Sequence, residues 1–168
     1  ESSRHPDLIH ALTIADRCNH SKLERSDVGN WQVIGDPTEG ALWVLAQKGG
    51  LDPEYEQDEQ PRIAEIPFDS AHKFMATFHH AGEVVEMFIK GAPDVLLARS
   101  CTWLGADREV ALDDAERAHI EAENERLATQ ALRVLAVARR VIPAQDFDPA
   151  GDLMSWAQDW TFVGLAGL

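Results

Sequence analysis

Apolar and β-prone residues fill two stretches, residues 73–80 and 83–90, on either side of Ala81-Gly82. This pattern predicts two antiparallel strands joined by a tight reversal, because Gly82 can adopt the positive φ that such a turn needs. If the loop is centred on Ala81-Gly82 and holds an even number of residues, the register of the hairpin follows. The predicted facing pairs are His80 with Glu83, Phe78 with Val85, Met75 with Phe88, and Lys73 with Lys90.

The predicted register sets Lys73 beside Lys90 on one face of the hairpin. Like charges that face each other on a sheet are mildly destabilising. Two ammonium groups next to Met75 and Phe88 therefore suggest a site for an anion that has an apolar end, such as a nucleotide. The hairpin alone also permits a second interpretation, in which both lysines are solvated on an open sheet face.

The rest of the chain mixes helical and extended patterns. Before the hairpin we expect a helix from Pro6 to about Asn19, a polar loop over 21–30, a strand over 31–35, a helix after Asp36, an acidic loop over 51–61 and an extended segment over 62–68. Directly after it we expect a helix over 93–99 and an irregular segment or small hairpin over 102–110. The rest is expected to form a helix from 113 to about 130, a buried strand over 131–142, an acidic linker over 143–159 and a final strand.

The helix after Asp36 has the clearest boundaries. Asp36 is a candidate N-cap, Pro37 suits the first helical position, and Gly49-Gly50 ends the pattern. Glu39 is expected to be the acid of a capping box, a role that would explain it without any ligand. Three apolar residues of this helix are expected to face the sheet: Leu42, Leu45 and Ala46.

The composition narrows the class of protein. With 168 residues, 45% of them hydrophobic, the chain can form one globular domain with its own core. The formal net charge of −14 argues against a general nucleic-acid or anionic-membrane surface, so phosphate binding needs a local basic cluster. No stretch approaches the roughly 18 consecutive apolar residues of a spanning helix. We expect a soluble, monomeric domain, and its apolar end, DWTFVGLAGL, suggests excision from a larger protein.

Two other classes of function remain open at this point. Cys18 and Cys101 are far apart and are expected to be free thiols, as in a cytosolic protein. A metal-binding protein is suggested by His79-His80, but adjacent residues of a strand point to opposite faces. A pure interaction module would need no lysine pair and would show no stabilisation by nucleotide.

Four ordered motifs resemble those of one known family. They are GDPTEGAL at 35–42, FDSAHKFM at 68–75, KGAPDVLL at 90–97 and LRVLAVA at 132–138. In this wording and order the chain resembles the nucleotide-binding domain of P-type ATPases, the cation pumps that form an aspartyl-phosphate. The resemblance implies an α+β fold in which helices pack around a twisted, mainly antiparallel sheet.

The resemblance also assigns roles to individual residues. Glu39 would hydrogen-bond the edge of adenine, and Phe68 would stack on its face. Lys73 and Lys90 would line the pocket floor and the phosphate side, and Arg133 would reach the phosphate tail. Two further residues complete the expected binding set: Met75 at the apolar end and Gly91, where a ligand can approach the backbone closely. Ser70 stands where many family members have arginine, so one phosphate contact is expected to be missing.

The resemblance implies a cofactor and partners. ATP, or Mg-ATP in a full-length pump, would bind here, while the family's DKTGT segment is not found in this sequence. The domain is therefore expected to bind ATP and ADP without turnover. Its partners would be a phosphorylation domain and a transmembrane domain of one longer chain in a bacterial plasma membrane, with this domain on the cytoplasmic side. The wording is most similar to calcium-type pumps.

Overall fold

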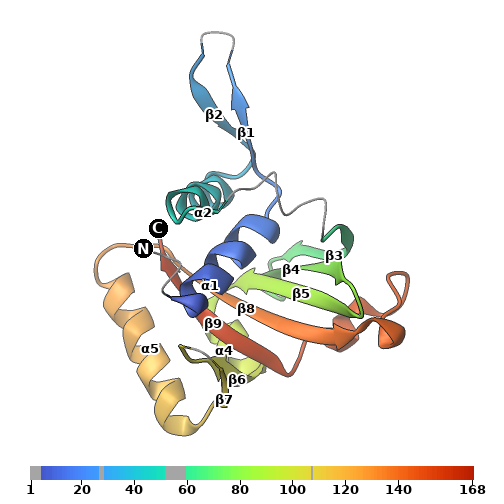
Figure 1. Cartoon of the computed structure of the whole chain (residues 1–168). Coiled ribbons are helices and arrows are strands. Elements are labelled where there is room, and N and C mark those ends of the chain that lie inside the picture. Colours follow the sequence, from blue (N-terminus) through green and yellow to red (C-terminus); the bar gives the residue numbers. More distant parts are fainter. Residues whose placement is uncertain (1–4, 27–28, 52–59, 107) are drawn as a thin grey trace.

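A computed structural model describes residues 5–26, 29–51, 60–106 and 108–168 of the chain. Helices surround a mostly antiparallel sheet, which confirms the α+β prediction (Figure 1). The helices are α1 (Pro6–Arg17), α2 (Pro37–Lys48), α4 (Pro93–Arg99) and α5 (Asp114–Ala128), with short 3-10 turns η2 (Ala144–Asp146) and η3 (Leu153–Trp156). The strands are β1 (Lys22–Arg25), β2 (Trp31–Ile34), β3 (Arg62–Asp69), β4 (Phe74–Ala81), β5 (Val84–Gly91), β6 (Ser100–Leu104), β7 (Glu109–Ala111), β8 (Val134–Pro143) and β9 (Trp160–Gly167).

Seven strands form the main sheet in the order β3-β4-β5-β8-β9-β6-β7. All neighbours are antiparallel except β6 and β9, which run parallel. The helix α1 lies across one face, where Ile14 and Cys18 pack against Met75, Phe88 and Val137. The opposite face carries the larger core, in which α4 and α5 cover the sheet. Consequently β4 is buried on both faces along most of its length.

The β4–β5 hairpin forms as predicted, but its predicted register is wrong. The loop is Gly82-Glu83, so that Ala81 faces Val84 and Met75 faces Lys90. Gly82 has a φ of 66° at the first central position of the turn. The predicted loop would have put Ala81 there, and alanine does not readily adopt a positive φ. The predicted facing of Lys73 and Lys90 is therefore wrong, since Lys73 lies before β4, in the turn that follows β3.

Two further predictions need correction. Residues 22–25, expected to be loop, form β1, which pairs with β2 in a hairpin that projects from the body (Figure 1). Main-chain pairing between two short strands needs no buried apolar face, so the apolar pattern did not reveal β1. The helix α2 packs mainly against α1, with Leu42 and Ala46 buried between them, whereas Leu45 is 39% exposed.

The other predicted elements are present. Residues 100–111 form the small β6–β7 hairpin, one of the two structures expected there, and Asp113 caps α5 by accepting from the Glu116 N–H. Both cysteines are free, Cys18 buried and Cys101 exposed. The predicted acidic loop falls largely on residues 52–59, outside the described residues. Within the described part of the chain, no helix has the length and hydropathy needed to cross a membrane.

Candidate functional site

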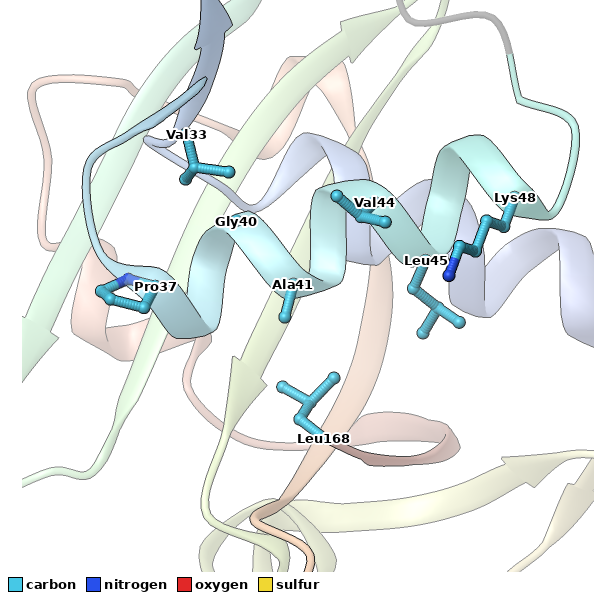
Figure 2. Close-up of a pocket in the computed structure, with 8 residues that line it drawn as sticks. All are labelled: Val33, Pro37, Gly40, Ala41, Val44, Leu45, Lys48 and Leu168. Carbon is cyan, nitrogen blue, oxygen red and sulfur yellow. The ribbon is translucent and has the colours of Figure 1, made fainter. Parts of the chain in front are cut away.

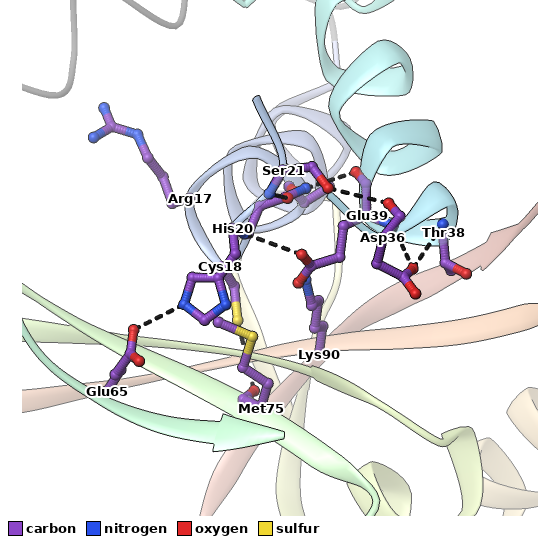
Figure 3. A network of polar contacts seen from close by, with 12 residues as sticks. Arg17, Cys18, His20, Ser21, Asp36, Thr38, Glu39, Glu65, Met75 and Lys90 are labelled. Atoms are coloured by element: carbon purple, nitrogen blue, oxygen red, sulfur yellow. Dashed lines mark hydrogen bonds and ion pairs between the residues drawn. The ribbon is translucent and has the colours of Figure 1, made fainter. Parts of the chain in front are cut away.

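Glu39 turns its carboxylate away from the helix cap and toward the sheet. The carboxylate of Asp36 caps α2 by accepting from the N–H groups of Thr38 and Glu39, at 2.8 and 3.2 Å. The bond from the Glu39 N–H, and after it the bond from the Thr38 N–H, holds the pKa of Asp36 below its ordinary value. The described bonds of the Glu39 carboxylate go instead to Lys90 and to the backbone N–H of His20 (Figure 3). The capping-box role predicted for Glu39 is therefore replaced by contacts to distant residues.

Lys90 supplies a nearly buried positive charge beneath α2. The residue is 7% exposed, and its Nζ lies 2.5 Å from Oε1 of Glu39. Its neighbour across the hairpin is Met75, whose carbonyl accepts a hydrogen bond from the thiol of Cys18. Burial raises the pKa of this thiol, so Cys18 is a packed neutral group rather than a charged one. The site thus joins an ion pair to an apolar floor.

Phe68 lies at the surface beside this floor. Between Ile66 and Asp69 the β3 strand carries a bulge, which sets Pro67 and Phe68 opposite the single residue Met75. Because Asp69 pairs with Phe74, the alternation of side chains puts Phe68 on the Met75 face of the sheet. Its side chain is 63% exposed. A phenylalanine that large and that open is not a core residue, and its ring is accessible to a planar ligand.

The turn before β4 carries Lys73 in a different setting from the one predicted. Lys73 has a φ of 58° and donates its backbone N–H to the Asp69 carbonyl. Its side chain is 56% exposed, and the only ion pair described for it is a loose one, 3.9 Å from Nζ to the Asp94 carboxylate. Lys73 is therefore an exposed surface cation at the mouth of the site rather than a partner of Lys90.

Gly91 packs closely against the start of β4. A Cβ at Gly91 would lie within 2.8 Å of the backbone and side chain of Phe74 and closer still to the Lys73 carbonyl. The space next to Gly91 is filled by the start of β4, and the Ala92 N–H donates to that same carbonyl. The space on the Cβ side of Gly91 is therefore occupied by the neighbouring strand, and approach of a ligand to the Gly91 backbone stays a prediction.

Arg133 reaches α2 from the start of β8. Its backbone pairs with Leu168 in both directions, which holds the residue beside the end of β9. Its exposed guanidinium donates to the hydroxyl of Thr38 at 3.2 Å, next to Glu39 in the chain. Arg133 is therefore a second cation at the rim of the site, on the side of the α2 N-terminus. Ser70 lies exposed in the turn between β3 and β4.

Sequence reasoning missed a group of residues that surround Glu39. They form the turn after α1, and Asn19 and Ser21 are buried there with 7% exposure each. The ring of His20 contacts Glu65 at 2.9 Å, and this bond lowers the pKa of that carboxyl group. A polar run directly after a helix was the available signal, since such residues often bond to backbone groups left open at helix ends. No three His, Cys, Asp or Glu residues of the described ranges form a metal-binding group.

An apolar groove of about 420 Å³ runs along the opposite side of α2 (Figure 2). It is lined by Val33, Pro37, Gly40, Ala41, Val44, Leu45, Lys48 and Leu168. Helical spacing explains the separation, because positions 37, 41, 44 and 48 share one face of α2 while Glu39, Leu42 and Ala46 share the other. None of the site residues expected from the sequence lines the groove.

Comparison with known proteins finds a matching family and relatives over nearly the whole chain. A family model described as the P-type ATPase cytoplasmic domain N matches residues 7–168. A calcium-transporting ATPase of Bacillus subtilis is 40% identical over 99% of this chain, and the match covers 18% of that protein. A cation-transporting ATPase of Synechocystis is 37% identical over 97% of the chain, covering 17% of its own length. A calcium-transporting ATPase of Listeria monocytogenes is 36% identical over 96% of the chain. The chain thus spans about a sixth of the length of these relatives.

Proposed function

Because the chain belongs to the family of P-type ATPase cytoplasmic N domains, we propose that it binds ATP and ADP between α2 and the β3–β4–β5 end of the sheet. Phe68 carries this proposal most directly, since a phenylalanine 63% exposed beside a buried ion pair has no packing role of its own. An aromatic face next to directional polar groups is the ordinary composition of a site for a nucleobase.

Glu39 gives this site a preference for adenine. A carboxylate only accepts hydrogen bonds, and it has about four lone-pair positions, of which Lys90 and the His20 N–H use two. The remaining positions suit the amino group that adenine carries at N6. Guanine presents a carbonyl oxygen at the same place, which would face the carboxylate without a proton between them. ATP should therefore bind more tightly than GTP.

The phosphates would extend toward exposed cations. Against a net charge of −14, the arrangement supplies Lys73 at one rim and Arg133 at the other. Each is exposed, so each attracts phosphate through a screened interaction of modest strength. Moderate affinity with only a weak dependence on Mg²⁺ follows, because the described residues hold no group of acids that would bind the metal.

In the longer protein the domain would present the γ-phosphate to a phosphorylation domain, which would couple hydrolysis to cation transport by a transmembrane part. The family's DKTGT segment does not occur in this sequence, so the domain alone would bind nucleotide without turnover. The names of the relatives from Bacillus subtilis and Listeria monocytogenes favour calcium as the transported ion. The description of the family favours a cytoplasmic domain, which we propose belongs to a pump of a bacterial plasma membrane.

Calorimetric titration with ATP, ADP, GTP and adenosine tests the proposal. The domain should bind ATP with and without Mg²⁺, bind GTP more weakly, and release no phosphate in the steady state. Phe68→Ala should weaken adenosine and ATP alike by about 1–3 kcal/mol, a range measured for bases stacked in nucleic-acid complexes. Val141→Ala is the matched control, since Val141 is 48% exposed on another strand. Equal adenosine binding by the wild type and Phe68→Ala would refute the stacking role.

A further inference from the structure

We infer that Asn19 is a positioning residue for nucleotide recognition, and that it acts by fixing Glu39. The inference rests on the proposed function and extends it to the turn formed by residues 18–21, between α1 and β1. Asn19 is buried, and its side chain bonds to three separate backbone groups. Its amide nitrogen donates to the carbonyls of Ala15, at 3.2 Å, and Glu39, at 2.8 Å, while its oxygen accepts from the Ser21 N–H at 2.8 Å.

One side chain therefore joins the last turn of α1 to the first turn of α2. Asn19 uses three of its four hydrogen-bonding positions in doing so, which leaves little freedom of rotation. The next residue contributes as well, because the His20 N–H donates to Oε2 of Glu39 at 3.2 Å. The turn thus holds Glu39 at both its backbone carbonyl and its carboxylate (Figure 3).

Ser21 fixes the start of α2 in the same way. Its hydroxyl donates to the Asp36 carbonyl at 3.1 Å, at the N-cap. The packing there is close, since a Cβ at Gly35 would lie 2.7 Å from the Ser21 hydroxyl oxygen. Both the beginning of the helix and the residue in its first turn are consequently set by one four-residue turn.

The turn itself is attached to the sheet. Arg62, at the start of β3, donates through Nη2 to the carbonyls of Arg17, at 2.6 Å, and Asn19, at 2.9 Å. The Cys18 thiol donates to the Met75 carbonyl of β4. The 18–21 turn is therefore bonded to β3 and β4, the strands that carry Phe68 and Met75. In this way it fixes Glu39 relative to these two residues.

Such a fixed position matters for recognition of the base. Lys90 attracts the Glu39 carboxylate strongly at 2.5 Å, so a carboxylate held by Lys90 alone would be free to pivot about that single contact. The bond from the His20 N–H restrains this pivot at the carboxylate, and the bond from Asn19 fixes the Glu39 backbone from which the side chain extends, so that the free lone pairs stay aimed at the base. Recognition loses strength when a group of this kind moves by more than about 0.5 Å.

The test measures ATP and GTP binding to the wild type, Asn19→Ala, Glu39→Gln and the double variant. We expect Asn19→Ala to weaken ATP about tenfold, equivalent to about 1.4 kcal/mol, and to shrink the preference for ATP over GTP. In the Glu39→Gln background, Asn19→Ala should change ATP affinity by less than about twofold, because the neutral amide accepts more weakly from the base than the carboxylate and fixing its position therefore contributes less.

A matched control separates positioning from loss of stability. Ser100→Ala removes a hydroxyl that is equally buried and that donates to the Leu96 carbonyl at 2.7 Å, near the other end of the sheet. It should lower thermal stability while leaving the ratio of ATP to GTP affinity unchanged. If Asn19→Ala does not fold, Asn19→Ser carries the same test, since it keeps a small uncharged polar group and loses the amide that joins Ala15 to Glu39.

The outcomes distinguish the two levels of the claim. A wild-type domain that binds no ATP overturns the proposed function and this inference together. A wild type that binds ATP, with Asn19→Ala equal to it in affinity and base preference, overturns the inference alone. Additive losses in the double variant also overturn it, because Asn19 would then act on binding by a route that bypasses Glu39.

Discussion

Lys90 and Glu39 form an ion pair whose members are both largely withdrawn from water, with side chains 9% and 16% exposed. Taking such charges out of water is costly, and among the described residues the contact between them and the bond from the His20 N–H offset that cost. The pair is therefore sensitive to the loss of either member. The two charges of the pair cancel each other, so a ligand has no net charge to neutralise here. Recognition of a base by Glu39 would therefore depend on hydrogen bonding rather than on net charge.

Replacing Lys90 should accordingly destabilise the domain even without nucleotide. Lys90→Met leaves the Glu39 carboxylate without its main partner, and we expect a loss of about 1–3 kcal/mol in the free energy of unfolding. Lys73→Met is the control, because an exposed lysine in a loose pair should change stability by about 0.5 kcal/mol or less. Urea unfolding of both variants checks this, and equal stabilities of Lys90→Met and wild type would argue that the pair contributes nothing.

His79 should make stability depend on pH. Its ring is buried in β4, contacts the Thr77 hydroxyl at 2.9 Å and the Gln60 carbonyl at 3.2 Å, and burial lowers its pKa to about 4. Because the unfolded chain has the higher pKa, near 6.5, the unfolded state binds more protons between these values. The contribution of neutral His79 is present above about pH 6.5 and is lost as pH falls toward 4, by up to about 3 kcal/mol.

Urea midpoints measured across that interval, for the wild type and His79→Gln, isolate this contribution. The variant is expected to be less stable at neutral pH, but its stability should fall less steeply between pH 6.5 and 4. Parallel slopes for the two proteins would mean that His79 takes up its proton without cost in the folded state.

At this residue scale the sequence nominated the candidate side chains, whose role in binding stays a prediction, and missed what holds them. Glu39, Phe68 and Lys90 stand in recognisable motifs, and their place near one another agrees with those motifs. The contacts of Glu39 could not be inferred, because they come from His20 and Lys90, which lie far from it in the chain and meet it only after folding. A capping box, which is local, was the simpler expectation.

At the scale of the elements, the hairpin of β4 and β5 shows how a correct element can carry an incorrect register. Alternating apolar residues predict both strands, whereas the register depends on whether Gly82 takes the first or the second central position of the turn. Gly82 takes the first position, so the centre of the turn lies one residue beyond the predicted one. As a result Met75, rather than Lys73, faces Lys90.

The end of this hairpin also predicts a contrast between two glycines. Gly91→Ala should cost about 1–3 kcal/mol, because its Cβ would meet the backbone of Lys73 and Phe74, which cannot move without disturbing the start of β4. Gly164→Ala in β9 has open space around the new methyl group and should be neutral. Thermal unfolding distinguishes them, and a Gly91→Ala domain as stable as Gly164→Ala would show that the turn before β4 adapts freely.

At the scale of the whole molecule, the sheet separates packing from recognition. One face and the far strands form the main core, while the α1 face at the β3–β4–β5 end holds the nearly buried Glu39–Lys90 pair and Met75 below the exposed ring of Phe68. Motif order predicted this overall arrangement, including the α+β class. It did not predict the projecting β1–β2 hairpin or the packing of α2 on α1, since neither has a distinctive apolar pattern.

The central claim, that adenine nucleotides bind at this end of the sheet, is tested most directly by nuclear magnetic resonance on the unaltered domain. Amide shifts recorded during titration with adenosine should change around Glu39, Phe68, Met75 and Lys90, and ATP should extend the changes to Lys73 and Arg133. The groove beside Leu45, on the opposite side of α2, should stay unchanged. Shift changes confined to that groove, or none at millimolar ATP, would contradict the account.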